Sequence, residues 1–297
     1  RGVRLVGSEM DIRDRHCTVA TNQPAMTAAS FAEQVDLNEG GKAVDNKLAR
    51  LLIDVCRSQS VAVFGNVSIA ILLACAISFG YAHLHQHPIL DAHTTAYEFK
   101  SIDIINRPTL WYAAIAGLWL FCSGIIAGFF DNRADYLNLR QRLPFNPLLR
   151  KIMRPKPRRV LAAYIHKHYG SLFGNFIFGM LLGMTGYFGH LLGLPLDIRH
   201  VAFSSANLGY AAVSGNVGFG TFMLGICSVL AIGLVNLIVS FTLALFVALR
   251  SRGTKIGSVG NLCKSFWQQI KANPLILFFP VTPVQTKEPV KEQGEKH

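Results

Sequence analysis

The sequence is short of charge: Asp, Glu, Lys and Arg make up only 15% of its 297 residues, whereas soluble proteins carry about 25%. The shortage is uneven, because residues 58–90, 109–130, 168–196 and 200–249 contain no charged side chain. Each stretch has the roughly 20 residues that a helix needs to cross about 30 Å of hydrocarbon. The composition therefore excludes a soluble nucleic-acid-binding domain or a disordered chain, and it predicts a multispan membrane protein.

Signals for metal or disulfide frameworks are also lacking. The six cysteines are scattered, and none forms a Cys-x-x-Cys pair. Neither a zinc site nor a disulfide framework is indicated, and we expect no cofactor. No leader peptide is visible, and since the sequence begins at Arg1 we expect a truncated or processed start.

The uncharged stretches predict four spans, at residues 61–84, 110–130, 170–195 and 221–249. Of the 29 basic residues, 26 lie before the first span, between the second and third, or after the fourth. An excess of Lys and Arg marks the cytoplasmic side of a membrane. We therefore expect an all-α, polytopic membrane helix bundle with about four transmembrane helices and cytoplasmic termini.

Three regions follow from this topology. Residues 1–57 form a cytoplasmic N-terminal segment whose amphipathic helix lies either on anionic lipid or against other cytoplasmic parts. Residues 58–250 form the membrane domain, with a basic cytoplasmic loop at 131–169 and an outer segment at 197–220 that is a loop or a short re-entrant piece. Residues 251–297 form a cytoplasmic tail that is partly disordered.

Polar and small residues within the spans are candidates for contacts between helices. Asn66, Asn175 and Asn236 lie in apolar surroundings, where an amide requires a partner, so they indicate hydrogen bonds between helices or a polar path for a solute. Gly179 and Gly183 are spaced for close approach of two helices, within the bundle or in a homo-oligomer. The predicted spans contain no Asp, Glu, Lys or Arg, which disfavours transport driven by an intramembrane carboxylate.

Two clusters at the outer side could carry chemistry. His83, His85, His87 and Asp91 are weak metal-ligand candidates, because imidazoles two residues apart share one side of an extended chain; the alternative is a set of solvated histidines. The second cluster stands between two uncharged stretches, and we expect it to be a structural clamp, in which two side chains form an ion pair, rather than a catalytic site. Its members are Asp197, Arg199 and His200.

Four segments resemble a bacterial multispan family catalogued as "site-specific recombinase", the Gcr-like group. They are GLPLDIRHVAFSSAN (193–207), NLIVSFTLALFVALRSRG (236–253), FDNRADYLNLRQRL (130–143) and NQPAMTA (22–28). The resemblance covers about residues 18–260 and implies a protein of the bacterial inner (cytoplasmic) membrane. Because family members are roughly twice as long, we expect this chain to be the C-terminal half of such a protein, from a disrupted gene, with the upstream half as a partner.

The family name implies DNA strand exchange, which needs a nucleophilic Ser or Tyr surrounded by arginines and a general acid. Arg199 and His200 are predicted on the outer side, away from DNA, and the cytoplasmic run at 150–169 is a short loop with Tyr164 and Tyr169. We therefore expect a non-enzymatic membrane scaffold or a solute-permeation module, with a DNA recombinase as the alternative.

The basic loop at 131–169 holds ten basic and two acidic residues. Its expected partners are membrane lipids with anionic headgroups, and DNA is not an expected partner. Four prolines are expected to prevent any long helix in this loop. They are Pro144, Pro147, Pro155 and Pro157.

Overall fold

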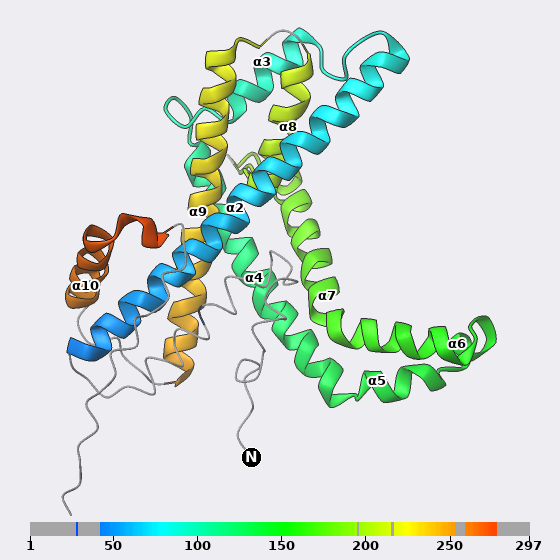
Figure 1. Cartoon of the computed structure of the whole chain (residues 1–297). Coiled ribbons are helices and arrows are strands. Elements are labelled where there is room, and N and C mark those ends of the chain that lie inside the picture. Colours follow the sequence, from blue (N-terminus) through cyan, green and yellow to red (C-terminus); the bar gives the residue numbers. More distant parts are fainter. Residues whose placement is uncertain (1–27, 29–41, 195, 215–216, 253–258, 278–297) are drawn as a thin grey trace, which may run out of the picture.

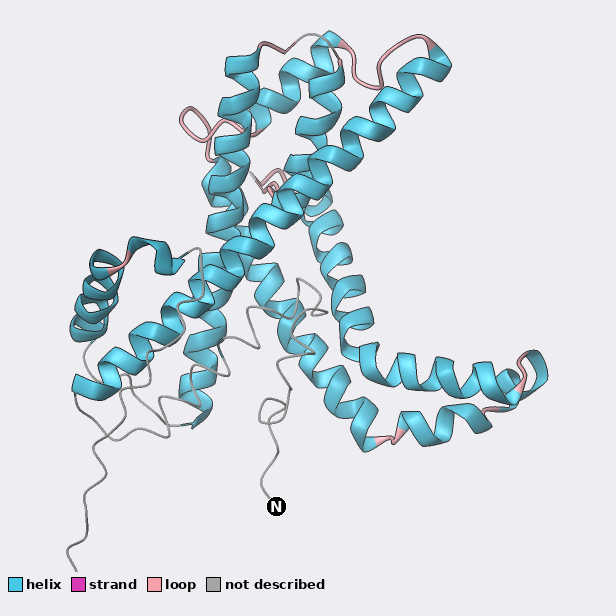
Figure 2. Cartoon of the chain, viewed as in Figure 1, coloured by secondary structure: helices cyan, strands magenta, loops and turns pink. Residues whose placement is uncertain are grey.

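The computed structural model of the chain describes residue 28 and residues 42–194, 196–214, 217–252 and 259–277. Every regular element in this part of the chain is a helix, as Figure 2 shows, which confirms the predicted all-α class. The elements are α2 (Lys42–His85), α3 (Ala92–Ser101), α4 (Thr109–Tyr136), α5 (Leu139–Arg142), η2 (Leu143–Phe145), α6 (Pro147–Ile152), α7 (Pro155–Leu192), α8 (Val201–Val213), α9 (Phe219–Arg252), α10 (Val259–Ala272) and η3 (Pro274–Leu277).

Four of these helices, α2, α4, α7 and α9, are long and apolar enough to cross a membrane, as the sequence predicts. They extend beyond the uncharged stretches, because charged residues limit the apolar stretch but do not end a helix. The amphipathic segment expected before the first span is continuous with it in α2. At 34 residues, α9 is about 50 Å long, so it must tilt or protrude if it crosses about 30 Å of hydrocarbon.

The long helices pack as two connected groups (Figure 1). In one group α4 contacts α7 and α9, and in the other α2 contacts α8 and crosses α9 diagonally. Small residues allow the closest approaches: a Cβ on Gly117 of α4 would lie 2.8 Å from the Asn236 carbonyl oxygen of α9, and one on Gly174 of α7 would lie 2.8 Å from Ala127 Cβ. Close backbone approach of this kind is typical of helix pairs in membranes.

Gly179 and Gly183, which the sequence predicts at a close contact between two helices, do not form such a contact within the part of the chain that the structure describes. Both lie on an exposed side of α7, and a Cβ on either would meet nothing within 4 Å among the described residues. Within one chain, the packing glycines of α7 are instead Gly170, Gly174 and Gly189. Sequence spacing identified the right kind of contact, but it could not identify the side of the helix that meets α4.

A helix in the C-terminal tail packs against the start of α2. Leu262 and Phe266 of α10 form one apolar cluster with Leu51 and Leu52 of α2 and Leu245 of α9. This contact favours the packed alternative for the amphipathic segment of α2. The sequence did not predict α10, and the polar part of the tail after Pro280, expected to be disordered, lies outside the described residues.

The basic loop at 131–169 is helical, and α5, α6 and the first half of α7 project sideways from the bundle (Figure 1). The expectation that prolines prevent any long helix here was wrong for Pro155 and Pro157. Both lie in the first turn of α7, where backbone N–H groups have no helical partner and proline is therefore tolerated. These two residues begin a helix of 38 residues.

The contact between α4 and α9 predicts that two Gly→Ala substitutions on α4 differ in their effect on stability. Gly117→Ala introduces a Cβ 2.8 Å from a backbone oxygen and should lower the free energy of unfolding by about 1 to 3 kcal/mol through overpacking. The matched control is Gly128→Ala, whose Cβ meets nothing within 4 Å and which should be neutral or stabilising by helix propensity. Thermal unfolding in detergent measures both; equal melting temperatures would contradict the packing.

Candidate functional site

The connection between α7 and α8 folds back into the bundle. Gly193 ends α7 in the left-handed conformation, with φ of 64°. The chain then returns along α7: Leu196 lies against Gly189, Ile198 packs on the cluster that contains Phe178, and the His200 ring lies 5.1 Å from that of Phe178, edge to face. We call residues 196–200 the re-entrant junction, and Figure 2 shows this loop among the helices.

Asn236 of α9 holds the end of this junction. Its side chain is only 2% exposed. The amide nitrogen donates to the carbonyl oxygens of Ala113 at 2.7 Å and Arg199 at 3.1 Å. The amide oxygen accepts a hydrogen bond from the Val201 backbone N–H at 3.1 Å, a group at the start of α8 that has no partner within the helix. One side chain thus joins α4, α8, α9 and the junction.

Arg199 fixes the other side of the junction. Its guanidinium forms an ion pair with Asp197 at 2.8 Å and donates to the carbonyl oxygens of Ser101 at 2.9 Å and Ile198 at 2.8 Å. The Arg199 side chain is 17% exposed and that of Asp197 43% exposed. Because a guanidinium offers several donors in a rigid plane, one arginine connects the junction to the end of α3.

A second polar contact, which the sequence analysis missed, links α3 to α8. Glu98 Oε2 accepts a hydrogen bond from Asn207 Nδ2 at 2.7 Å. The two residues line a shallow crevice that is partly open to solvent and has no room for even a water-sized molecule, whereas typical ligand pockets hold roughly 300 Å³ or more. The crevice is therefore too small to identify a substrate site. Asn207 is the last residue of the segment 193–207, which carries part of the family resemblance.

The four metal candidates do not converge. His83, His85 and His87 are exposed at the end of α2, and within the described part of the chain no group of three or more His, Cys, Asp or Glu side chains is placed to hold a metal ion. Asp91 instead caps α3 by accepting a hydrogen bond from the Thr94 N–H at 2.8 Å. Its hydrogen bonds with Thr94 hold the pKa of Asp91 below its usual value. The geometry assigns Asp91 to a helix cap.

The three asparagines predicted to bridge helices have different positions. Asn236 is buried and bonded to neighbouring elements. Asn66 and Asn175 lie at exposed positions of α2 and α7. The periodicity of an apolar helix does not show which side meets a neighbour, so the sequence could not separate these cases.

The two groups of residues considered for DNA strand exchange lie at different ends of α7. The Tyr164 ring lies against that of His168 in a tilted arrangement, with centroids 4.6 Å apart, and Tyr169 packs against Phe130 and Phe173. These tyrosines lie near the start of α7, whereas Arg199 is bonded within the junction that follows the end of α7. The geometry therefore separates Arg199 from both tyrosines along the length of α7.

A protein-family model described as "Site-specific recombinase" matches residues 7–280 of the chain. No curated protein and no solved structure matches the chain.

Replacing Asn236 with Leu should strongly destabilise the bundle. The substitution keeps the volume but leaves the Val201 N–H and two carbonyl oxygens without the bonds they make now, and an unsatisfied buried group costs roughly 1 to 3 kcal/mol. We expect the melting temperature in detergent to fall and the folded yield to drop. The control is Asn66→Leu, at an exposed position of α2, which should leave both unchanged; similar losses in the two variants would contradict the role of Asn236.

Proposed function

We propose that this chain, which belongs to the site-specific recombinase family, is a non-enzymatic helical scaffold of a bacterial inner membrane. The four long apolar helices support residence in a membrane. The distribution of basic residues, 26 of 29 on one side of the four spans, supports cytoplasmic termini.

The scaffold proposal rests on one observation: the polar side chains at the junction form hydrogen bonds and an ion pair with other groups of the protein. The Asn236 amide and the Arg199 guanidinium bond to backbone carbonyl oxygens and to Asp197. A catalytic or transport site needs polar groups directed at a substrate. Here the same groups connect α3, α4, α8 and α9, so their role is structural.

Solute permeation is the second candidate, because a re-entrant junction followed by a short helix is a feature of transporter binding sites. In those sites the N-terminus of the interrupted helix points at the substrate. In this chain the N-terminal Val201 N–H is bonded to Asn236, and the crevice beside α8 is small. The scaffold therefore explains more of the geometry than a permeation path.

Alkaline phosphatase fusions test the topology of the scaffold. The enzyme is active only on the outer side of the inner membrane, so a fusion after Ala96 in α3 should be active and a fusion after Met153, at the end of α6, inactive. High activity at Met153 would overturn the orientation, because the basic residues around it would then lie outside.

A DNA-binding assay tests the absence of strand exchange. The full chain in detergent should form no covalent adduct with supercoiled or duplex DNA. An adduct that survives denaturation and disappears in Tyr164→Phe or Tyr169→Phe would contradict the scaffold proposal and support the DNA recombinase alternative. In proteoliposomes, solute release that changes with Asp197→Asn would instead favour permeation.

A further inference from the structure

The arm formed by residues 139–168 exposes large apolar side chains although it carries much charge. It contains nine basic residues and no acidic one. Monomeric soluble proteins rarely expose apolar surface so densely, and such surface marks a contact with a protein or a membrane. The exposed residues are Phe145 (69%), Leu148 (70%), Ile152 (78%), Val160 (70%) and Tyr164 (55%).

The first half of α7 has one covered side and one open side. Ala162 is fully buried, and α7 contacts α5, which runs beneath this half of α7 in Figure 1. Val160 and Tyr164 lie two residues before and after it, which places them on the opposite side. Lys156, four residues before Val160, and Lys167, three residues after Tyr164, are exposed and continue that open side.

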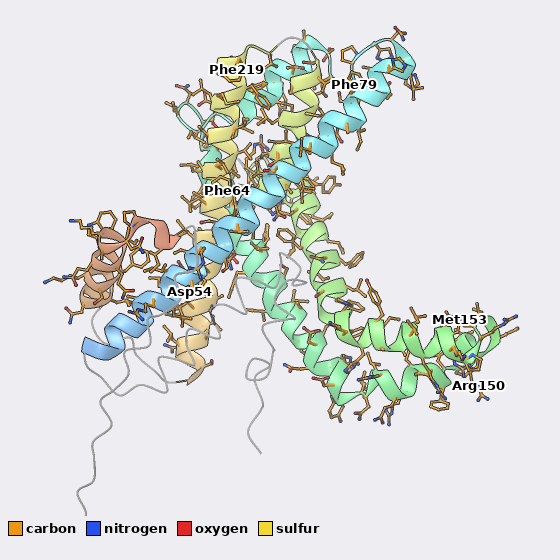
Figure 3. All side chains as sticks on the ribbon, viewed as in Figure 1. Asp54, Phe64, Phe79, Arg150, Met153 and Phe219 are labelled. Atoms are coloured by element: carbon orange, nitrogen blue, oxygen red, sulfur yellow. The ribbon has the colours of Figure 1, made fainter. Side chains whose placement is uncertain are left out.

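The open side of the arm faces away from α5, in the direction in which the apolar part of α7 continues. In Figure 1, α5 runs beneath the first half of α7, and α7 then turns upward, away from α5. Figure 3 shows Arg150 and Met153 at the tip of the arm, far from the bundle. If the apolar part of α7 crosses a bilayer, the open side of the arm lies along the surface of that bilayer.

We infer that the arm is a membrane-surface anchor that binds anionic phospholipid headgroups. Lys156 and Lys167 contact headgroup phosphates, while Val160 and Tyr164 enter the boundary between headgroups and acyl chains. The inference rests on the proposed membrane residence and adds a lipid partner to it. It also explains why the arm keeps apolar side chains exposed beside nine basic residues.

Anionic lipid fits this surface better than DNA does. Both offer phosphates to the lysines and arginines, but only a bilayer also offers an apolar phase to Val160 and Tyr164. Both ends of the arm continue into α4 and α7, which are candidate spans. The arm is therefore held within a Debye length of the headgroups, whereas DNA must be brought to it.

Collisional quenching in nanodiscs tests the anchor. The full chain, with its six cysteines replaced, receives one fluorescent label at Val160→Cys or, as a matched control, at Gln141→Cys in α5. The discs contain either phosphatidylcholine alone or a mixture with phosphatidylglycerol. In mixed discs, iodide should quench the label at position 160 several-fold less than the label at 141, because an aqueous ion does not enter the boundary between headgroups and acyl chains.

Charge reversal identifies the lysines. Lys156→Glu with Lys167→Glu should abolish the protection at position 160 in mixed discs, while Arg140→Glu with Arg142→Glu on α5, an equal change of charge, should preserve most of it. High salt should weaken the protection in the parent protein by screening.

Two outcomes would overturn the anchor. One is equal quenching at positions 160 and 141 in mixed discs; the other is protection at 160 that duplex DNA supplies in phosphatidylcholine discs and phosphatidylglycerol does not. Extraction of native membranes with alkaline carbonate separates this failure from failure of the scaffold. A chain released by carbonate contradicts membrane residence itself, whereas a retained chain with an unprotected position 160 contradicts only the anchor.

Discussion

The packing of this bundle depends on how an amide is satisfied in an apolar interior. Asn236 is buried among helices that offer few polar groups, and its three hydrogen bonds reach α4, the junction and the start of α8. A buried amide without partners is costly, so these elements must meet at the level of Asn236. The turn of the chain back along α7 after Gly193 delivers Arg199 and Val201 to that level.

The small residues of the long helices make this arrangement sterically possible. Gly117 lies against the Asn236 backbone oxygen, and Gly209 of α8 lies against Ile71 and Ala74 of α2. Trp119 of α4 donates a hydrogen bond to Thr185 of α7 at 2.8 Å, which satisfies the indole in the interface between α4 and α7. Close approach and polar satisfaction therefore act together, since the hydrogen bonds require short distances between helix backbones.

The class of the protein could be predicted from the sequence, because apolar length and charge distribution are local properties. The four long helices follow from uncharged stretches, and an ion pair between Asp197 and Arg199 follows from their isolation between two such stretches. Which side of a helix meets a neighbour is a tertiary property. Gly179 and Asn66 have the same local context as Gly174 and Asn236, yet the first pair is exposed and the second buried.

Helix starts were misjudged for a related reason. Pro155 and Pro157 signal a break when a segment is treated as a loop and a start when a helix follows, and only the continuity of α7 decides between them. The amphipathic α10 was missed because the polar end of the tail dominated its composition. Its partner surface, Leu51 and Leu52 of α2, is distant in sequence.

The central claim is that residues 196–200 fold back into the bundle and are closed there by the protein's own groups. Disulfide cross-linking in native membranes tests it, with Ile198→Cys paired to Leu182→Cys or Leu120→Cys in a chain without other cysteines. These residues belong to one apolar cluster, so the account predicts rapid cross-linking for at least one pair and little reaction of Ile198→Cys with a membrane-impermeant thiol reagent. Absence of both cross-links, with rapid labelling of position 198, would show an exposed outer loop and contradict the account.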